Sequence, residues 1–319
     1  MSYRFSVAPM LDWTTPACRR LHRLLAPRAL LYSEMISTGA IIHGDRDRHL
    51  AHDGDHPCAL QLGGGDPAEL ARATTLAAPY GYVEINLNAG CPSDRVQHNQ
   101  IGAVLMKEPR RLADCLSAMA AASPVPISLK HRLGVDEQDE GEIFDFIATL
   151  VEHSPCRKFI VHARKAWLKG LSPAENRTVP PLNYGLVFEI KRRFPGLEIV
   201  LNGGLEDIDG CARVLAAVDG VMVGRAAYQR PEMLLAVPRL HQEEALRLED
   251  VLPRITALLE SRLAAGESLF SYGRHLLGLG TGRPGARRFR QLLSEDGRRA
   301  GAGLEVWTGA LAALGYHAY

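Results

Sequence analysis

The chain has 319 residues, of which 46% are hydrophobic and 23% charged, and its formal net charge is +1. This length suits one large domain with an appendage or two domains, and no apolar run approaches the roughly 20 residues that span a bilayer. The near-zero net charge gives no argument for nucleic acid from the field of the whole molecule. The N-terminus has no signal-peptide pattern, so we expect a cytoplasmic protein without a membrane segment.

Eight short apolar runs within the first 230 residues each lead into a polar or glycine-containing end and then an amphipathic helical pattern. The predicted strands are residues 5–10, 30–35, 58–64, 82–88, 126–132, 158–164, 198–204 and 219–225. Helical patterns between them include residues 66–80, 109–123, 140–154 and 182–195. Because these strands are too apolar for a sheet with one solvated face, the pattern predicts an α/β fold of the (β/α)8 TIM-barrel type.

A doubly wound open sheet is the alternative for such alternating elements. That fold normally shows a glycine-rich GxGxxG turn after its first strand, and this chain has none there. After residue 237 the strand pattern stops, and residues 239–319 read as helices. We therefore predict a barrel domain over residues 1–237 and a separate all-helical C-terminal domain over residues 238–319.

The C-terminal ends of the strands form the active-site rim in barrels of this kind. Here those ends supply hydrogen-bonding groups from every predicted strand. In chain order they are Met10, Glu34, Gln61, Asn86 and Asn88 with Cys91, Lys130, His162 and Arg164, Asn202 to Gly204, and Gly224 with Arg225. A single member could be incidental, because Lys130 could be a surface lysine and His162 a core histidine. Their coincidence at one end predicts a functional site.

Cys91 lies directly after the fourth predicted strand, within Gly90-Cys91-Pro92. Glycine permits unusual backbone angles, and proline fixes its own φ and bars the helical region to the residue before it. We therefore expect the thiol on a tight turn at the end of the strand. No two of the six cysteines form a C-x-x-C pair, which favours a reducing compartment over a disulfide framework or a zinc site, and we expect no metal.

The seventh and eighth predicted strands end in small residues, Asn-Gly-Gly at 202–204 and Gly-Arg at 224–225. Glycines there either serve tight turns or let backbone N–H groups approach an anion, as in the phosphate sites of many barrels. Arg225 favours the second interpretation, because a guanidinium can bind a phosphate through two hydrogen bonds. The rim is thus predicted to hold a phosphorylated cofactor whose flat ring system extends over the barrel mouth toward Gln61, Lys130 and Cys91.

Residues 270–305 carry seven arginines and three acidic residues, and four of those arginines lie within residues 283–290. Such a cluster is either a solvated helix face or a surface that contacts a phosphate backbone. The residues alone leave both interpretations open.

Eight segments of the chain resemble, in order and spacing, the motifs of tRNA-dihydrouridine synthases. They are VAPMLDWT, LYSEM, ALQLGG, EINLNAGCPSDRV, LKHRLG, VHARKA, LNGG and DGVMVGRAAY. Two further stretches, LSPAENRTVPPLNY and RHLLGLGTGRPGARRFRQLLSE, resemble the branch that modifies positions 20 and 20a of the tRNA D-loop. The resemblance covers about residues 3–300.

The resemblance implies a flavin-dependent reduction of uridine to 5,6-dihydrouridine in tRNA, with Cys91 as the catalytic residue. The residues it implies for FMN binding are Pro9, Met10, Leu11, Gln61, Lys130, His162, Asn202, Gly203, Gly204, Gly224 and Arg225. The residues expected to contact tRNA are Asn88, Asn176 and Arg177, together with Arg283, Arg287, Arg288 and Arg290 of the basic cluster.

In the implied reaction NADPH reduces FMN, with NADH as the alternative reductant, and hydride passes from flavin N5 to C6 of uridine. Cys91 gives a proton to C5, which a thiol with an ordinary pKa of about 8.5 can do at neutral pH. Lys130 would stabilise negative charge near N1 and the C2 carbonyl of the flavin. The base must swing out of the folded tRNA, at a cost that the basic helical domain would offset.

Two other functions stay open at this point. A flavin barrel acting on a free pyrimidine, like dihydroorotate dehydrogenases, would share the fold and the phosphate site, but a small substrate needs no basic helical tail. A tRNA-binding protein without catalytic activity would be expected to lack Cys91 or Lys130, and both are present. We expect a monomer with tRNA as its partner.

Overall fold

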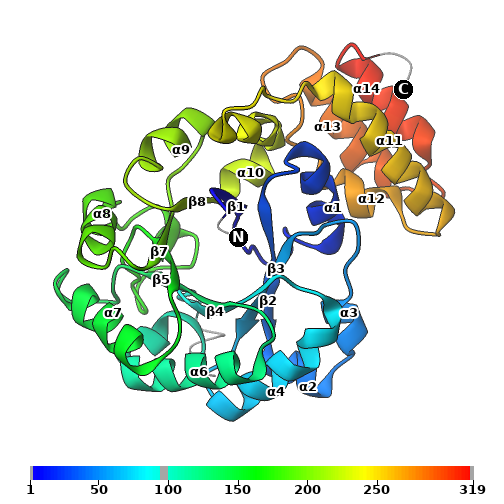
Figure 1. Ribbon diagram of the computed structural model, residues 1–319. Helices are drawn as coiled ribbons and strands as arrows, with labels where there is room; N and C mark the ends of the chain where they lie inside the picture. The colour runs from blue at the N-terminus through cyan, green and yellow to red at the C-terminus, as the bar shows by residue number, and fades with distance from the viewer. Residues whose placement is uncertain (1–2, 94–99, 317–319) are drawn as a thin grey trace.

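Eight parallel strands close into a barrel in the order β1 to β8, and β8 pairs with β1 (Figure 1). The structure is a computed structural model that describes residues 3–93 and 100–316. The strands are β1 (Phe5–Val7), β2 (Leu30–Ser37), β3 (Cys58–Gly63), β4 (Glu84–Ala89), β5 (Ile127–Arg132), β6 (Lys158–His162), β7 (Glu198–Asn202) and β8 (Gly220–Val223). The predicted (β/α)8 barrel is confirmed, and the open-sheet alternative is excluded.

Helices surround the barrel and continue beyond β8 (Figure 1). The α-helices are α1 (Pro16–Leu25), α2 (Thr38–His43), α3 (Arg46–Leu50), α4 (Pro67–Ala77), α6 (Pro109–Ala122), α7 (Glu142–His153), α8 (Tyr184–Arg193), α9 (Ile208–Val214), α10 (Arg225–Gln229), α11 (Leu248–Ala264), α12 (Leu269–Gly273), α13 (Ala286–Ser294) and α14 (Leu304–Ala313). The 3₁₀ segments are η1 (Ala78–Tyr80), η2 (Gly102–Lys107), η3 (Glu175–Arg177), η4 (Pro231–His241) and η5 (Asp296–Arg298). Among the described residues, no helix combines the length and the apolar character that a membrane span requires.

Capping residues explain where the helices between the strands begin. The side chain of Asp66 accepts the backbone N–H of Glu69 at the start of α4, and Pro67 occupies the first turn, where no N–H is needed. Thr15 caps α1 in the same way, ahead of Pro16. The four helical patterns predicted between the strands correspond to α4, α6, α7 and α8.

Several strands end earlier than the apolar pattern predicts. β1 stops at Val7 rather than at residue 10, and β6, β7 and β8 each stop two residues early. After β7 the chain leaves the sheet at once, because Gly203 has a φ of 104° that an extended strand does not allow. The last residues of these predicted strands therefore belong to the loops of the barrel mouth.

The interior of the barrel contains a small apolar cluster of its own, separate from the larger core between strands and helices. Its buried members are Ala8, Leu30, Tyr32, Ala59, Ile160, Val200 and Met222. Successive side chains of a strand alternate between its two faces, so the residue two positions later also points inward. On β3, β6 and β7 that later residue is Gln61, His162 and Asn202, three of the predicted site residues. The apolar cluster therefore lies beneath the mouth of the barrel.

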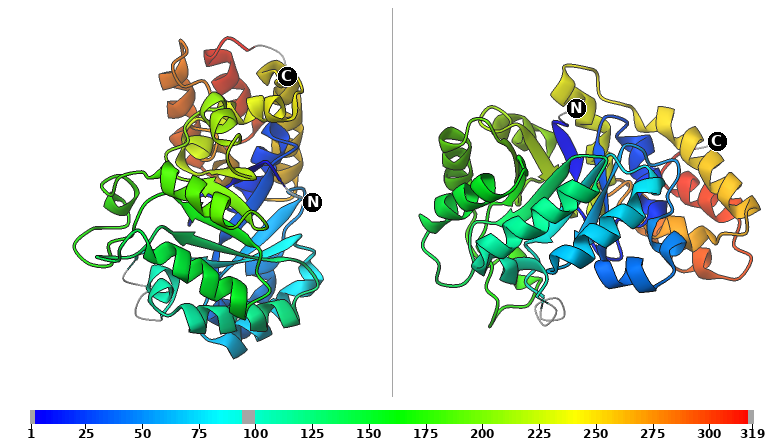
Figure 2. Two further views of the ribbon diagram at one scale, coloured as in Figure 1. Left: turned by 60° about the vertical axis from the view of Figure 1, so that its left-hand side comes forward. Right: turned by 60° about the horizontal axis from the view of Figure 1, so that its bottom comes forward.

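Beyond β8 the described residues form helices only, as predicted, and α11 to α14 lie together beside α1 (Figures 1 and 2). Trp307 of α14 packs edge-on against Phe289 of α13 and donates its indole N–H to Thr256 of α11 at 2.8 Å. These contacts give the helices a core of their own. We retain the division after residue 237 as a proposal.

The helical part contacts the loop that follows β1. Arg274 donates to the backbone carbonyl of Asp12. The two ring nitrogens of His275 lie 3.0 Å from the hydroxyl of Thr15 and 3.1 Å from that of Tyr228. Residues just after α12 are thus bonded to the same loop that carries part of the predicted cofactor site.

Candidate active site

Cys91 lies at the barrel mouth two residues after β4, and it is half-buried, whereas the other five cysteines are buried. The backbone N–H groups of Gly90 and Cys91 donate to Asn88 Oδ1 at 3.1 and 3.0 Å. The carbonyl of Cys91 accepts the N–H of Ala103 at 2.8 Å. These bonds hold the turn expected from the glycine and proline beside Cys91 and place the one accessible thiol at the end of the strand. Residues 94–99 of the following loop lie outside the described part of the chain.

Lys130 lies beside Asn88 in the pairing of β5 with β4 and is half-buried. Its ammonium has no hydrogen-bond acceptor within the described ranges. Burial lowers the Lys130 pKa to about 7, helped by the nearby Arg132 guanidinium and opposed by Cys91. An unpaired ammonium in this position can bind an acceptor from outside the chain. This environment differs from that of a solvated surface lysine.

The turn after β7 requires its two glycines. Gly203 and Gly204 have φ values of 104° and 69°, which other residues rarely adopt. A Cβ on Gly203 would lie 2.6 Å from the ring of His162, and one on Gly204 would clash with the side chain of Leu182. Tyr184 of α8 fixes the turn further by donating its hydroxyl to the carbonyl of Gly203 at 2.7 Å. His162 is thus held directly against this glycine turn.

The loop after β1 brings Pro9, Met10 and Leu11 to the same end of the barrel. Pro9 and Met10 are half-buried, whereas Leu11 is 68% exposed. A Cβ on Gly224 would make only ordinary contacts, at 3.6 Å from Ala8 and 3.7 Å from the sulfur of Met10. Crowding by other side chains therefore does not explain the glycine at position 224, in contrast to the turn after β7.

Arg132, Arg164 and Arg225 all donate to backbone carbonyls of one loop, residues 176–180. Arg132 Nη1 lies 2.8 Å from the carbonyl of residue 176, and Arg225 Nη2 lies 3.2 Å from that of residue 177. Arg164 bonds the carbonyls of residues 178 and 180. Burial and the Arg225 charge lower the pKa of Arg164. An anion at the mouth would relieve this repulsion between like charges.

Arg132 is a residue that sequence reasoning missed. Its Nε donates to the carbonyl of Gly90 at 2.9 Å, so it joins the Cys91 turn to the 176–180 loop. Burial lowers the pKa of Arg132 to about 10, and the nearby Arg177 and Arg164 charges act in the same direction. The available signal was its place two residues after Lys130 at the end of the same strand.

Asn176 does not fit the predicted direct contact with tRNA. Its side chain is fully buried, its Nδ2 donates to three carbonyl groups of its own loop, and its Oδ1 accepts the N–H of Trp167. All of its hydrogen-bonding capacity therefore serves the loop. Arg177 next to it has a largely exposed side chain. Partial burial of its guanidinium and the Arg225 charge lower its pKa.

The basic cluster divides into two kinds of arginine. Arg287, Arg288 and Arg290 are exposed on α13. Arg283 forms an ion pair of 2.5 Å with Glu232, so its charge is already engaged within the protein. We therefore retain the first three as candidates for phosphate contact and assign Arg283 mainly to holding the helical part in place.

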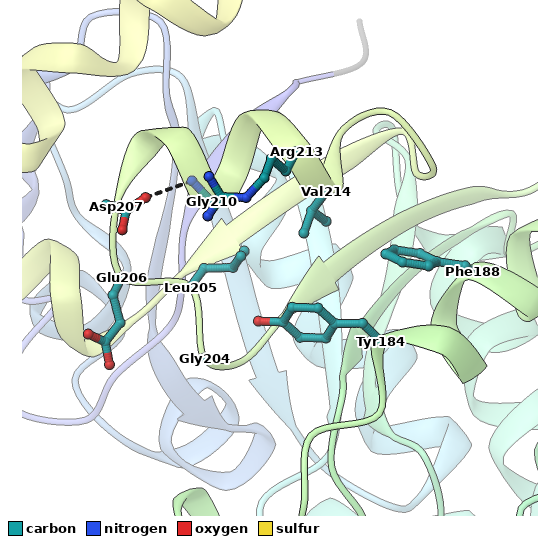
Figure 3. Close-up of a pocket in the computed structure, with 9 residues that line it drawn as sticks. All are labelled: Tyr184, Phe188, Gly204, Leu205, Glu206, Asp207, Gly210, Arg213 and Val214. Carbon is teal, nitrogen blue, oxygen red and sulfur yellow. Dashed lines mark hydrogen bonds between the residues drawn. The ribbon is translucent and has the colours of Figure 1, made fainter.

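A cavity of about 520 Å³ lies beside the β7–α9 connection, between it and α8 (Figure 3). Tyr184 and Phe188 line it from α8, and residues 204–207 and the side chains of α9 line it from the other side. Gly204 is its only lining residue that the sequence also predicted for the cofactor. The cavity is therefore a neighbour of the predicted site and not the site itself.

A group of metal-ligand residues, His52, Asp55 and His56, lies away from the mouth in the loop before β3. The two ring nitrogens of His52 lie 2.6 Å from Asp55 Oδ1 and 3.0 Å from the carbonyl of Tyr80. Arg19 occupies the second oxygen of Asp55 at 2.7 Å. Because the ligand atoms of His52 and Asp55 are already bonded within the protein, we interpret the group as a structural network.

A sequence profile of the family described as "Dihydrouridine synthase (Dus)" matches residues 6–309. A Pseudomonas aeruginosa protein named "tRNA-dihydrouridine(20/20a) synthase" is 50% identical over 319 residues, covering 98% of this chain and 96% of that protein. A Vibrio cholerae protein of the same name is 47% identical, covering 99% and 98%. The solved structure of a 2-naphthoyl-CoA reductase with 2-naphthoyl-CoA matches with a TM-score of 0.54 and 11% identity. That match covers 74% of this chain and 50% of the reductase chain, and it supports the barrel fold alone.

Proposed function

The chain belongs to the dihydrouridine synthase family, and from this premise we propose that it reduces uridines 20 and 20a of tRNA to 5,6-dihydrouridine. The observation that carries the proposal is the presence of one accessible thiol, Cys91, and one unpaired ammonium, Lys130, at the mouth of the same closed barrel. A proton donor and a fixed positive charge are what the reduction of a conjugated carbon–carbon double bond needs from the protein.

We propose FMN as the bound cofactor, and the donor set fits it. The unpaired Lys130 ammonium and the mutually repelling arginines suit a ring with an anionic phosphate. When bound, the flavin would supply the hydride from its N5. The residues proposed to hold it are Pro9, Met10, Leu11, Gln61, Lys130, His162, Asn202, Gly203, Gly204, Gly224 and Arg225.

The chain's own part of the reaction follows from the mouth. Cys91 would donate its thiol proton to C5 of the uracil ring, and its partial exposure lets the thiol recover a proton from solvent. Lys130 would hold its positive charge beside the ring and so stabilise negative charge that develops there. Contact with negative charge would also raise the Lys130 pKa from its low value, which keeps the ammonium protonated at neutral pH.

The proposed reductant is NADPH, with NADH as the alternative, visiting the cofactor transiently. The chain has no GxGxxG turn after its first strand to hold a dinucleotide permanently. The proposed partner is tRNA, which would meet Arg177 and Asn88 at the mouth and Arg287, Arg288 and Arg290 on α13. We propose a cytoplasmic location, where tRNA and reduced nicotinamide are both present.

The purified protein tests this proposal in two steps. It should be yellow, with about one FMN released per chain on denaturation. Incubated with NADPH and tRNA from a strain that lacks the enzyme, it should form dihydrouridine at positions 20 and 20a, mapped by primer extension. Equal activity on free uridine would instead favour an enzyme of free pyrimidines, and bound flavin with no activity on tRNA would refute the proposed substrate.

Replacing Arg287, Arg288 and Arg290 together with alanine should weaken tRNA binding and flatten its salt dependence. Each lost phosphate contact reduces the magnitude of the slope of log K against log salt concentration by about 0.7–0.9. The slope of the triple variant should therefore be shallower by roughly 2 to 3. Filter binding at several salt concentrations measures this slope. Arg192→Ala with Arg193→Ala on α8 is a matched control, since both are exposed and lie on another side of the barrel (Figure 1). An unchanged slope in the triple variant would remove α13 from the RNA surface.

A further inference from the structure

A continuous row of side-chain hydrogen bonds runs inside the barrel from its base to the Cys91 turn. Its members come from β3, β4 and β5, which are neighbours in the sheet (Figure 1). We call them the amide row, and from the base upward they are Glu84, Ser128, Asn86, Gln61 and Asn88. The four consecutive donor–acceptor distances are 2.5, 2.7, 2.7 and 2.9 Å. The first four members are buried, and Asn88 is half-buried at the mouth.

Every bond of the amide row has the same direction. The hydroxyl of Ser128 donates to Glu84 Oε1, and Asn86 Nδ2 donates to that hydroxyl. Gln61 Nε2 donates to Asn86 Oδ1, and Asn88 Nδ2 donates to Gln61 Oε1. Each side-chain amide of the row therefore gives one N–H to the neighbour nearer the base and accepts a hydrogen bond on its oxygen from the side of the mouth.

Glu84 sets this direction, because a carboxylate accepts hydrogen bonds and donates none. Lys158 donates to its Oε2 at 2.9 Å, and the hydroxyl of Tyr32 donates to its Oε1 at 2.5 Å. Lys158 also contacts Glu198 at 3.2 Å. With the carboxylate surrounded by donors, Ser128 has to donate to it, and each amide above is oriented in turn.

The amide row ends on the turn that carries the thiol. Asn88 Oδ1 accepts the backbone N–H groups of both Gly90 and Cys91. If the row ran the other way, the NH₂ group of Asn88 would face these two N–H groups, donor against donor. Donors that face one another without an acceptor cost free energy, so the turn would open or shift. The orientation at the base is thus coupled to the position of Cys91.

We propose that Glu84 is a positioning residue for uridine reduction, which it serves by orienting Gln61 and Asn88 through the amide row. This inference rests on the proposed function. Gln61 and Asn88 each keep one side-chain N–H that has no partner in the described part of the chain, so the row presents donors at the mouth. Uracil offers carbonyl acceptors at C2 and C4, whereas cytosine has an amino donor at C4. The remaining N–H of Asn88, held in place by the row, therefore favours uracil, and that of Gln61 is left for the cofactor.

Glu84→Gln tests this coupling. The new amide would turn its carbonyl to Lys158, because the buried ammonium needs an acceptor, and its NH₂ would then face Ser128 and reverse the row. We expect the backbone N–H groups of Gly90 and Cys91 to exchange with solvent at least about tenfold faster, as for the loss of one hydrogen bond. This is measured by NMR in the flavin-free protein. The kcat/KM on tRNA per bound flavin should fall about 10²-fold, as for a misplaced reacting group.

Two further variants separate orientation from charge. Glu198→Gln removes the other carboxylate at Lys158, which is not a member of the amide row, and it should change exchange and kcat/KM by less than about threefold. Ser128→Ala interrupts the row and keeps both carboxylates, and it should reproduce both effects of Glu84→Gln. Because the two changes act on one chain of bonds, the double variant should be no worse than either single variant.

Normal exchange at Gly90 and Cys91 together with normal kcat/KM in Glu84→Gln would overturn the proposal. Equal losses of kcat/KM and of exchange protection in Glu198→Gln would also overturn it, because the effect would then come from the lost charge. Faster exchange throughout β7 and β8 would overturn it as well, because the whole barrel would then be less stable. If Glu84→Gln does not fold, Ser128→Ala provides the same measurements. The exchange experiment needs neither flavin nor RNA. A wild-type protein that is inactive on tRNA would therefore refute the proposed function, and the exchange rates would still test the coupling between Glu84 and the Cys91 turn.

Discussion

Cys91→Ala should slow uridine reduction in tRNA by about 10²–10⁴-fold, the usual contribution of a general acid, and should leave flavin binding and flavin reduction by NADPH unchanged. Alanine has no proton to give, whereas the bonds of the turn to Asn88 involve only the backbone at position 91 and persist. Two measurements separate the half-reactions: bleaching of the flavin on mixing with NADPH, and dihydrouridine formed per flavin in a single turnover with tRNA.

Alkylation provides an independent version of the same experiment. Cys91 is the only cysteine of the six that is not buried, so iodoacetamide should modify it first and inactivate the wild-type enzyme. The matched control is Cys115→Ala in α6, which removes a buried thiol and should keep normal turnover. A Cys91→Ala enzyme that reduced tRNA at the normal rate would show that another group supplies the proton.

Lys130→Met should reduce the rate of uridine reduction by about 10²–10³-fold, as for the removal of one preorganised electrostatic contact. Methionine keeps an unbranched chain of similar length, so the loss reports the charge. The measurement is again dihydrouridine per bound flavin in a single turnover, with flavin affinity determined separately by fluorescence. Lys107→Met at an exposed ion pair with Asp136 is the control for a generic loss of charge.

Lys130 also predicts how stability depends on pH. Its pKa is about 7 in the folded chain and 10.5 for the ordinary side chain, so between these values the unfolded chain binds more protons. The free energy of unfolding of the flavin-free protein should therefore rise with pH across this window, and Lys130→Met should flatten the rise. Urea unfolding at several pH values between 7 and 10 measures it. An equal rise in both proteins would mean that the ammonium is well solvated in the folded state.

The sequence predicts the barrel well because its signals are local. Each strand is a short apolar run and each following helix has its own start signal, as at Asp66 and Pro67. The rim residues follow from the fold, since parallel strands of one barrel all end at the same side. Cys91 could be placed on its turn from its two neighbours alone, because glycine and proline restrict the backbone directly.

What the sequence could not predict depends on contacts between strands distant in the chain. Arg132 bonds a carbonyl 42 residues away, and Asn88 bonds Gln61 across 27 residues. Such pairs are set by the register of the closed barrel, which no local pattern specifies. Asn176 shows the same limit, because an asparagine in an exposed loop gives no sign that its own loop will bury it.

The bonds from Arg274 and His275 to the loop after β1 have a consequence for how a uridine is chosen. They attach the helical part to the loop that carries Pro9 and Met10 at the barrel mouth, so the separation between the α13 arginines and the mouth is set by the folded chain. A tRNA bound to α13 as proposed would present its nucleotides at different distances from that helix. Only nucleotides whose distance matches the separation between α13 and the mouth would then reach Cys91, and their neighbours would be rejected without any contact to a base.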